Sequence, residues 1–85
     1  MKRFFKREAE SELGAGTAYV ESSDGWPTRQ VEVYGATWRW GDEAHPQYLA
    51  DQAVGVLELG VEHELSKTEF ERVWTEALQR FRPQS

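Results

Sequence analysis

The strongest constraint on the fold of this chain is an amphipathic stretch near its end. Apolar side chains recur there at steps of three and four residues, which places them on one stripe of an α-helix. The residues on this stripe are Phe70, Val73, Trp74, Ala77, Leu78 and Phe81. Ser66 and Glu69 have the spacing of a capping box at the start of a helix. We predict a helix over residues 66–82 whose apolar stripe is covered by the rest of the chain.

We predict that a β-hairpin supplies the surface that covers this stripe. Gly35-Ala36 is its two-residue loop, with glycine at the first central position, as a type II′ turn prefers. The resulting cross-strand pairs are Tyr34–Thr37, Val33–Trp38, Glu32–Arg39 and Val31–Trp40. In this register both valines face tryptophans on one side of the hairpin, and the glutamate faces the arginine on the other.

A preceding strand over Thr17–Ser22 extends the hairpin into a meander. We predict a register in which Val20 lies opposite Val31 and Ala18 opposite Val33, so that these small and branched side chains join the tryptophan face. The polar face then carries Tyr19, Glu21, Gln30, Glu32, Tyr34, Thr37 and Arg39.

The remaining segments complete a single domain. Phe4 and Phe5 favour a short N-terminal strand, and the segment from residue 41 follows neither the helical nor the strand period. The predicted parts are a strand with a flexible connection (1–16), the meander (17–40), an irregular segment with a small strand near Val61–Leu65 (41–65) and the helix (66–82). The sequence therefore predicts an α+β fold: an antiparallel β-meander of three to four strands with one C-terminal helix packed on one face.

Composition excludes several classes of protein. The chain has no cysteine, which rules out disulfides, thiolate metal sites and cysteine nucleophiles. No apolar run approaches the roughly 18 residues needed to cross a bilayer. The basic N-terminus is followed by acidic residues 8–12 instead of the apolar core of a signal peptide. We therefore expect a cytoplasmic protein without membrane contact, whose net charge of −5 favours basic partners.

Two motifs resemble a known group of proteins. They are Arg29-Gln30-Val31-Glu32-Val33-Tyr34 and Leu65-Ser66-Lys67-Thr68-Glu69-Phe70-Glu71-Arg72-Val73-Trp74. Their order and separation resemble a family of small uncharacterised bacterial α+β domains with an R-x-V-E-V strand and a terminal I/L-S-x-x-E-F-E-x-V-W helix. The resemblance implies a compact domain without an assigned catalytic residue. Some small acidic bacterial proteins of this kind act as immunity or antitoxin-like partners.

No set of residues predicts catalysis or cofactor binding. The two histidines, His45 and His63, lack the spacing of metal ligands. Glu32 is the carboxylate most firmly held in the predicted sheet, but pairing with Arg39 would lower its pKa, which is the wrong direction for a general acid at neutral pH. We predict that the protein is not an enzyme and has no cofactor and no metal.

Residues suited to partner binding are predicted on the sheet face away from the helix. Tyr19, Glu32, Tyr34 and Arg39 share this face in the predicted register, and tyrosine and arginine are common interface anchors. An open antiparallel face is also often plain solvated surface. Trp26, in a turn, is either a plug over the sheet edge or an exposed anchor.

The leading hypothesis is a small acidic protein-interaction module, immunity- or antitoxin-like, that binds a basic toxin or nuclease. One alternative is a nucleic-acid-binding accessory protein that uses its basic N-terminus, with Phe4 or Phe5 stacking on bases; the acidic remainder of the chain argues against it. Another alternative is a homo-oligomeric structural protein. A monomer and a homodimer both stay open.

Overall fold

The computed structural model describes residues 1–55, 57 and 59–82 of the chain. Four strands form one antiparallel sheet in the order β1-β2-β3-β4, followed by one α-helix. Their bounds are β1 (Lys2–Ser11), β2 (Gly14–Ser23), β3 (Trp26–Tyr34), β4 (Thr37–Asp42) and α1 (Lys67–Arg80). Two short 3-10 turns, η1 (Pro46–Tyr48) and η2 (Val61–His63), lie between the sheet and the helix in sequence. The predicted α+β meander with one C-terminal helix is confirmed.

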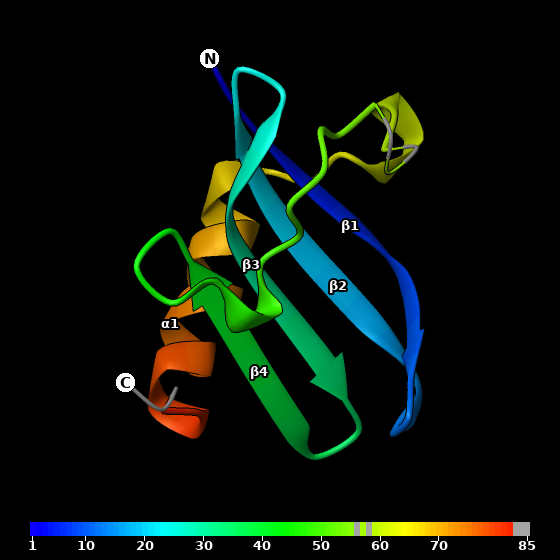
Figure 1. Cartoon of the computed structure of the whole chain (residues 1–85), viewed down its shortest axis with the longest axis vertical. Helices are drawn as coiled ribbons and strands as arrows, with labels where there is room; N and C mark the ends of the chain where they lie inside the picture. Colours follow the sequence, from blue (N-terminus) through cyan, green and yellow to red (C-terminus); the bar gives the residue numbers. More distant parts are fainter. Residues whose placement is uncertain (56, 58, 83–85) are drawn as a thin grey trace.

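The sheet is covered on both faces. Figure 1 shows α1 behind the sheet and the connection between β4 and η2 crossing in front of it. The helix contacts all four strands. One apolar core therefore lies beneath the helix, and a second, smaller one lies beneath the connection.

The hairpin of β3 and β4 has the predicted register. Val31 pairs with Trp40, Val33 with Trp38, and the closing pair is Tyr34–Thr37. The loop glycine, Gly35, has φ of 61°, in the left-handed region that a primed turn requires at its first central position. The period-two pattern of this segment was therefore sufficient to fix its pairing.

The predicted register between β2 and β3 is wrong by one residue. Tyr19, not Val20, lies opposite Val31, and the register shifts again between Glu21 and Ser22 at a β-bulge. A one-residue change moves every side chain of a strand to the other face. Tyr19 and Glu21 therefore lie on the helix side, while Ala18 and Val20 lie on the opposite side.

The predicted flexible connection after the N-terminal strand is also wrong. Strand β1 runs to Ser11, and a tight turn leads directly into β2, with Ser11 paired to Gly14. Gly14 has φ of 99°, a conformation that strongly favours glycine. The residues predicted as a flexible connection thus form part of the β1–β2 hairpin at one edge of the sheet.

The larger core joins α1 to the sheet. Its buried members are Phe4, Val31, Trp40, Phe70, Trp74 and Ala77, with Tyr19, Val33, Trp38, Leu65, Val73 and Phe81 partly buried around them. Ser66 caps the helix by accepting a hydrogen bond from the Glu69 amide at 3.1 Å. The predicted stripe is confirmed except for Leu78, which is 44% exposed.

The smaller core lies on the opposite face of the sheet. Phe5, Val20 and Leu59 form it. Hydrogen bonds hold the connection in place: Gln30 accepts from the Ala50 amide at 2.8 Å. The segment 41–65 is irregular as predicted, but its small strand reduces to a single bridge between Glu64 and Phe5. Residues 56 and 58 of that prediction lie outside the described residues.

Candidate functional site

The residues predicted for partner binding do not form one surface. Tyr19 lies on the helix side of the sheet, opposite Val31. Trp26 begins β3 at the turn after β2 and is 56% exposed, so it does not plug the sheet edge. The other three predicted residues, Glu32, Tyr34 and Arg39, lie on the face away from the helix.

On that face Tyr34 and Arg39 are held in packing contacts. The Tyr34 ring is buried against the backbone of Gly16. The guanidinium of Arg39 lies 5.3 Å from the centroid of the Tyr34 ring and 4.9 Å from that of Tyr48. Arg39 also forms an ion pair of 2.7 Å with Glu12 in the turn between β1 and β2. Both side chains therefore serve the fold at the hairpin ends.

The predicted ion pair between Glu32 and Arg39 is not formed, although the two residues are cross-strand partners. Arg39 takes Glu12 instead, and Glu32 accepts a hydrogen bond of 3.1 Å from Gln30. Burial raises the pKa of the Tyr34 phenol, and the negative charge of Glu32 adds to the effect. This keeps the phenol neutral across the physiological range.

A small cavity of about 140 Å³ lies between this face and the connection that crosses it. Arg7, Glu32 and Tyr34 contribute polar groups to its wall, and Val20 and Leu59 contribute apolar ones. Arg7 is fixed by a hydrogen bond of 2.8 Å to the Leu57 carbonyl. The cavity is large enough for a few water molecules but small for a metabolite.

Partly exposed apolar side chains lie elsewhere, on the helix side of the sheet. Tyr19, Val33 and Trp38 lie there at the margin of the main core. Two cations cover the rings: Arg80 lies 5.1 Å from the centroid of Trp38, and Lys6 lies 5.8 Å from that of Tyr19. We call these five residues the aromatic corner.

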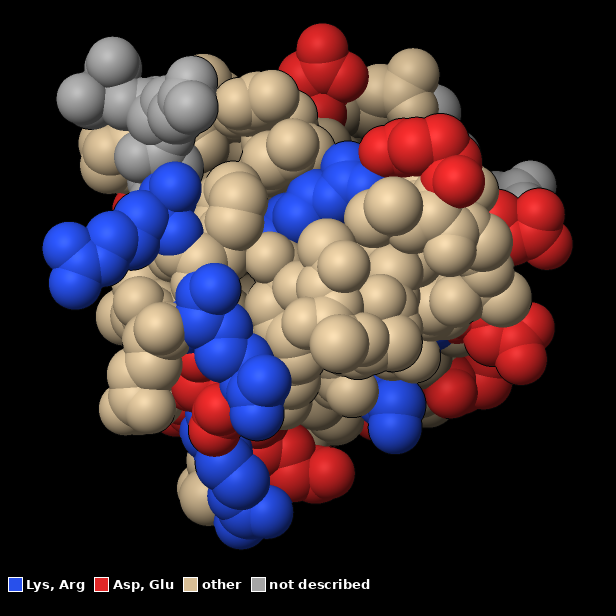
Figure 2. Space-filling model, turned by 90° about the horizontal axis from the view of Figure 1, so that it is seen from below, with Lys and Arg blue, Asp and Glu red and all other residues tan. Residues whose placement is uncertain are grey.

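Figure 2 shows the end of the molecule that carries the β1–β2 and β3–β4 turns. An area without charged residues occupies its centre, and charged side chains of both signs lie around it.

Helix length explains why this corner is left open. With 14 residues, α1 spans about 21 Å, whereas the 10-residue strands β1 and β2 span about 33 Å. Contacts fix both ends of α1 on the sheet: Phe70 in its first half packs on Phe4, and the carbonyl of the C-cap residue Phe81 accepts a hydrogen bond of 2.7 Å from Trp40. It cannot also cover the far halves of the strands.

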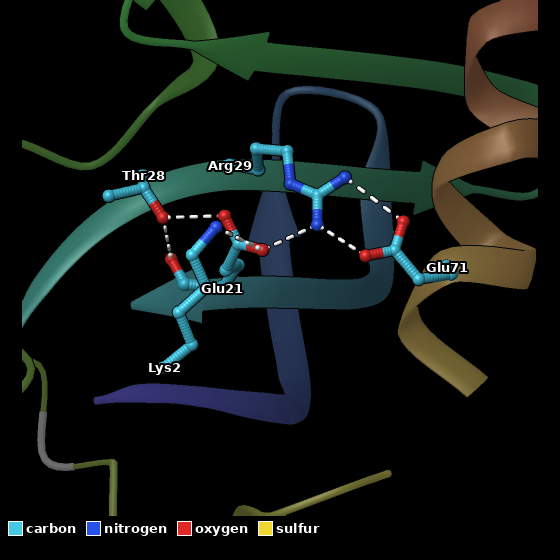
Figure 3. A network of polar contacts seen from close by, with 5 residues as sticks. All are labelled: Lys2, Glu21, Thr28, Arg29 and Glu71. Atoms are coloured by element: carbon cyan, nitrogen blue, oxygen red, sulfur yellow. Dashed lines mark hydrogen bonds and ion pairs between the residues drawn. The ribbon is translucent and has the colours of Figure 1, made fainter. Parts of the chain in front are cut away.

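The most developed polar cluster of the structure connects the sheet to the helix (Figure 3). Arg29 forms ion pairs with Glu21 on β2 and with Glu71 on α1, the latter at 2.6 Å. Thr28, the extra residue of the bulge, donates a hydrogen bond of 2.7 Å to Glu21, and Lys2 lies 3.6 Å from the same carboxylate. We call these five residues the Glu21 network.

The Glu21 network keeps its two carboxyl groups, Glu21 and Glu71, ionised. Burial would raise the pKa of Glu21, but the hydrogen bonds from Arg29 and Thr28 and the charges of Arg29 and Lys2 outweigh it and lower the pKa. The hydrogen bond from Arg29 likewise lowers the pKa of Glu71. A carboxylate held ionised in this way is suited to anchoring a helix and poorly suited to donating a proton at neutral pH.

The basic N-terminal side chains are divided between both faces of β1. Lys2 joins the Glu21 network, Arg3 pairs with Glu64, and Lys6 lies over Tyr19. Phe4 and Phe5 are buried in separate cores. Neither ring is therefore accessible for stacking on a nucleic acid base.

No metal centre is evident in the part of the chain that the structure describes, because none of its His, Asp and Glu residues form a group of three or more that could hold an ion. His45 Nδ1 lies 3.2 Å from Asp42, and His63 Nδ1 lies 3.2 Å from the Gly60 amide. Both imidazoles thus have local partners within their own turns.

Comparisons with protein-family models, with curated proteins and with solved structures gave no match to this chain. The resemblance to small bacterial α+β domains therefore stays a prediction. Among the described helices, none combines the length and the apolar character needed to span a membrane.

Sequence reasoning assigned Val33 and Trp38 to the covered core and missed their partial exposure. Their place opposite the helix stripe was correct. The signal that could have revealed the open corner was the mismatch between helix and strand lengths, but the full length of β1 and β2 was not recognised.

Proposed function

We propose that this chain is a small protein-interaction module that binds a partner protein through the aromatic corner. The observation that carries the proposal is the partial exposure of Tyr19, Val33 and Trp38 as one group, with Lys6 and Arg80 over the two rings. Tyrosine, tryptophan and arginine are the residues most enriched among those that dominate binding energy.

The rigid setting of these residues supports a binding role. Tyr19, Val33 and Trp38 come from three adjacent strands of one sheet: Trp38 pairs with Val33, and Tyr19 pairs with Val31, two residues away along β3. Side chains that are already ordered lose little conformational entropy on association. The same backbone also fixes their relative positions before any partner arrives.

Net charge supports a narrower class of partner. The chain carries −5, and complementary charge accelerates association and favours partners of opposite sign. A basic toxin or nuclease that is neutralised by an immunity- or antitoxin-like protein fits this charge. The aromatic corner supports protein binding, whereas the basic character of the partner rests on net charge alone.

A binding role is also favoured over catalysis by the state of the polar groups. The most enclosed carboxylate among the described residues, Glu21, is held in ion pairs and hydrogen bonds with a lowered pKa. The buried phenol, Tyr34, has a raised pKa. The first shift keeps the carboxylate ionised at neutral pH, and the second keeps the phenol protonated. Neither group is therefore poised to exchange a proton.

Affinity capture with a matched pair of tryptophan variants tests the proposal. Wild type, Trp38→Ala and Trp26→Ala are immobilised separately and exposed to native lysate at low and moderate salt. Trp26 is the control because it is the more exposed tryptophan and lies outside the aromatic corner. We expect a protein partner that wild type and Trp26→Ala retain and that Trp38→Ala loses.

Circular dichroism must first show that both variants are folded, since Trp38 also touches the core. Where Trp38→Ala is unfolded, Tyr19→Ser replaces it in the same comparison. Equal retention of the partner by the corner variant and the control contradicts the assignment of the surface. Capture of no protein at either salt concentration contradicts the proposed function.

A further inference from the structure

The outer edge of β1 is a second feature with the properties of a binding site. Because the sheet order is β1-β2-β3-β4, β1 has a neighbouring strand on one side only. Among the described residues, only Glu64 bridges the outer side, opposite Phe5, where the Leu65 amide donates to the Phe4 carbonyl at 3.0 Å. The second half of β1 lies beyond this bridge.

The direction of the backbone groups in this half follows from the antiparallel pattern. Residues of an antiparallel strand direct their N–H and C=O groups alternately toward the two sides. The outward carbonyl of Phe4 sets the phase, so Glu8 and Glu10 present their amide and carbonyl groups to the outside. Arg7 and Ala9 bond inward to β2. The edge therefore offers two adjacent positions for an added strand.

Open space adjoins these two positions. A hollow of about 540 Å³ is lined by Lys6, Arg7, Glu8, Thr17, Leu57 and His63. A second hollow of about 420 Å³ continues along Glu8 and Glu10. Figure 1 shows the lower half of β1 at the margin of the molecule, with β2 on one side and none of the described elements on its outer side.

Charge identifies the occupant. The exposed carboxylates of Glu8 and Glu10 lie on the same side of the strand, and none of the ion pairs between described residues involves them. Like charges directly opposite one another destabilise a pair of strands, whereas opposite charges stabilise it. Lys6 shares this side of β1 but lies over Tyr19, and the Arg7 guanidinium is held by the Leu57 carbonyl. Positions 8 and 10 therefore repel acidic residues of an added strand and complement basic ones.

We propose that the outer edge of β1 at Glu8–Glu10 binds an extended basic segment of a partner protein by strand addition. The partner strand forms backbone hydrogen bonds with Glu8 and Glu10 and places lysine or arginine opposite their carboxylates. The inference rests on the proposed protein-binding function but uses a surface separate from the aromatic corner. It adds the conformation and the charge of the segment that is recognised.

Amide hydrogen exchange followed by NMR tests this edge directly. The probe is a short capped peptide in which lysine alternates with valine and threonine. Without peptide, we expect the amides of Glu8 and Glu10 to exchange fast and those of Arg7 and Ala9 to be protected by β2. Saturating peptide should protect Glu8 and Glu10 at least about tenfold while leaving Arg7 and Ala9 unchanged, because only the outward amides gain a partner.

Two variants test the backbone and charge contributions. Glu8→Pro removes an outward amide that bonds to no described strand, together with one of the two carboxylates, so the protein should remain folded and lose the peptide. Glu8→Lys combined with Glu10→Lys keeps both amides and should weaken binding about tenfold by charge repulsion. The double variant keeps the test decisive where the proline variant does not fold. A peptide with glutamate in place of lysine is the matched ligand control and should not bind.

Three outcomes overturn the inference. One is the absence of new protection at Glu8 and Glu10 with saturating peptide. Another is protection that arises without peptide as the protein concentration is raised, because a second copy of the chain then occupies the edge. The third is a response confined to Tyr19 and Trp38, which would place the peptide at the aromatic corner and leave the protein-binding proposal intact.

Discussion

Glu21 and Arg29 form an ion pair beneath the N-terminal half of α1, where the Glu21 side chain is only 2% exposed. The Arg29 guanidinium also lies 5.0 Å from the ring centroids of both Phe70 and Trp74. A single arginine therefore connects the bulged strand pair to the polar and aromatic residues of the helix. Its partners have to be removed one at a time to show which contact stabilises the fold.

We predict that Glu21→Ala lowers the free energy of unfolding by about 3 kcal/mol, since removal of one member of a buried ion pair leaves the other incompletely compensated. Glu21→Gln, which keeps the size of the side chain, should cost less. Lys2→Ala is the control, because Lys2 is mostly exposed and lies 3.6 Å from Glu21, and its loss should cost under about 1 kcal/mol. Urea denaturation measures all three; equal losses for Glu21→Ala and Lys2→Ala would show that burial of the pair has no consequence.

The Glu21 network should also make stability depend on pH. The pKa values of Glu21 and Glu71 are lowered in the folded state, so both carboxylates stabilise the fold fully above their ordinary pKa of 4.5. This contribution is lost as the pH falls through the lower, folded-state values, because the unfolded chain binds protons first. Arg29 stays protonated throughout and does not contribute to the change.

Denaturation midpoints recorded from about pH 7 down to about pH 3 check this dependence. Wild type should lose stability steeply below pH 4.5. Glu21→Gln should start lower and fall less steeply, while Glu43→Gln, at an exposed position, should parallel wild type. Parallel curves for wild type and Glu21→Gln would show that Glu21 is not the titrating group.

Gly16 should be irreplaceable by a larger residue. A β-carbon at this position would lie 2.2 Å from the Val33 carbonyl oxygen and 2.4 Å from Cδ1 of Tyr34. The first of these is backbone and cannot move aside, so we predict that Gly16→Ala costs at least about 1–3 kcal/mol, the range for overpacking. Gly55→Ala is the control, since a β-carbon there meets nothing within 4 Å. Thermal denaturation of both should separate them clearly; similar midpoints would contradict the close approach of β2 and β3 at this point.

The hairpin of β3 and β4 could be predicted from the sequence because only one register satisfies both its turn and its side-chain alternation. Its loop has a glycine where a positive φ is needed, and its alternation places both valines opposite tryptophans. The helix was equally accessible, through its stripe and its Ser66 cap. Local sequence patterns were sufficient to predict these two elements because their side-chain patterns identify one main buried face.

The register of β2 could not be predicted, because both faces of the sheet are covered. Val20 packs under Leu59 in the smaller core, while Tyr19 packs in the larger one. Apolar side chains on both faces make neighbouring registers equally acceptable by hydrophobic matching. The bulge at Thr28 adds a residue that no period-two pattern reveals.

The error in the β2 register also affected the prediction of the candidate site. Tyr19 was predicted on the face away from the helix, whereas it lies half-buried on the helix side, the same side as Trp38 and Val33. The β1 edge was also missed, since residues 8–16 read as a flexible connection. Gly14 and Gly16 suggested flexibility, whereas one forms a tight turn and the other admits the Tyr34 ring. Composition alone does not distinguish these uses of glycine.

The helix stripe offers a last test of the architecture, because two of its residues differ sharply in burial. Phe70 is fully buried, with its ring centroid 5.3 Å from that of Phe4, whereas Leu78 is 44% exposed. We predict that Phe70→Ala costs about 3–5 kcal/mol, as for other buried aromatic side chains, and that Leu78→Ala costs less than about 1 kcal/mol. Urea denaturation monitored by tryptophan fluorescence measures both. A larger loss for Leu78→Ala than for Phe70→Ala would mean that α1 is rotated about its axis, in which case the aromatic corner would not be exposed as described.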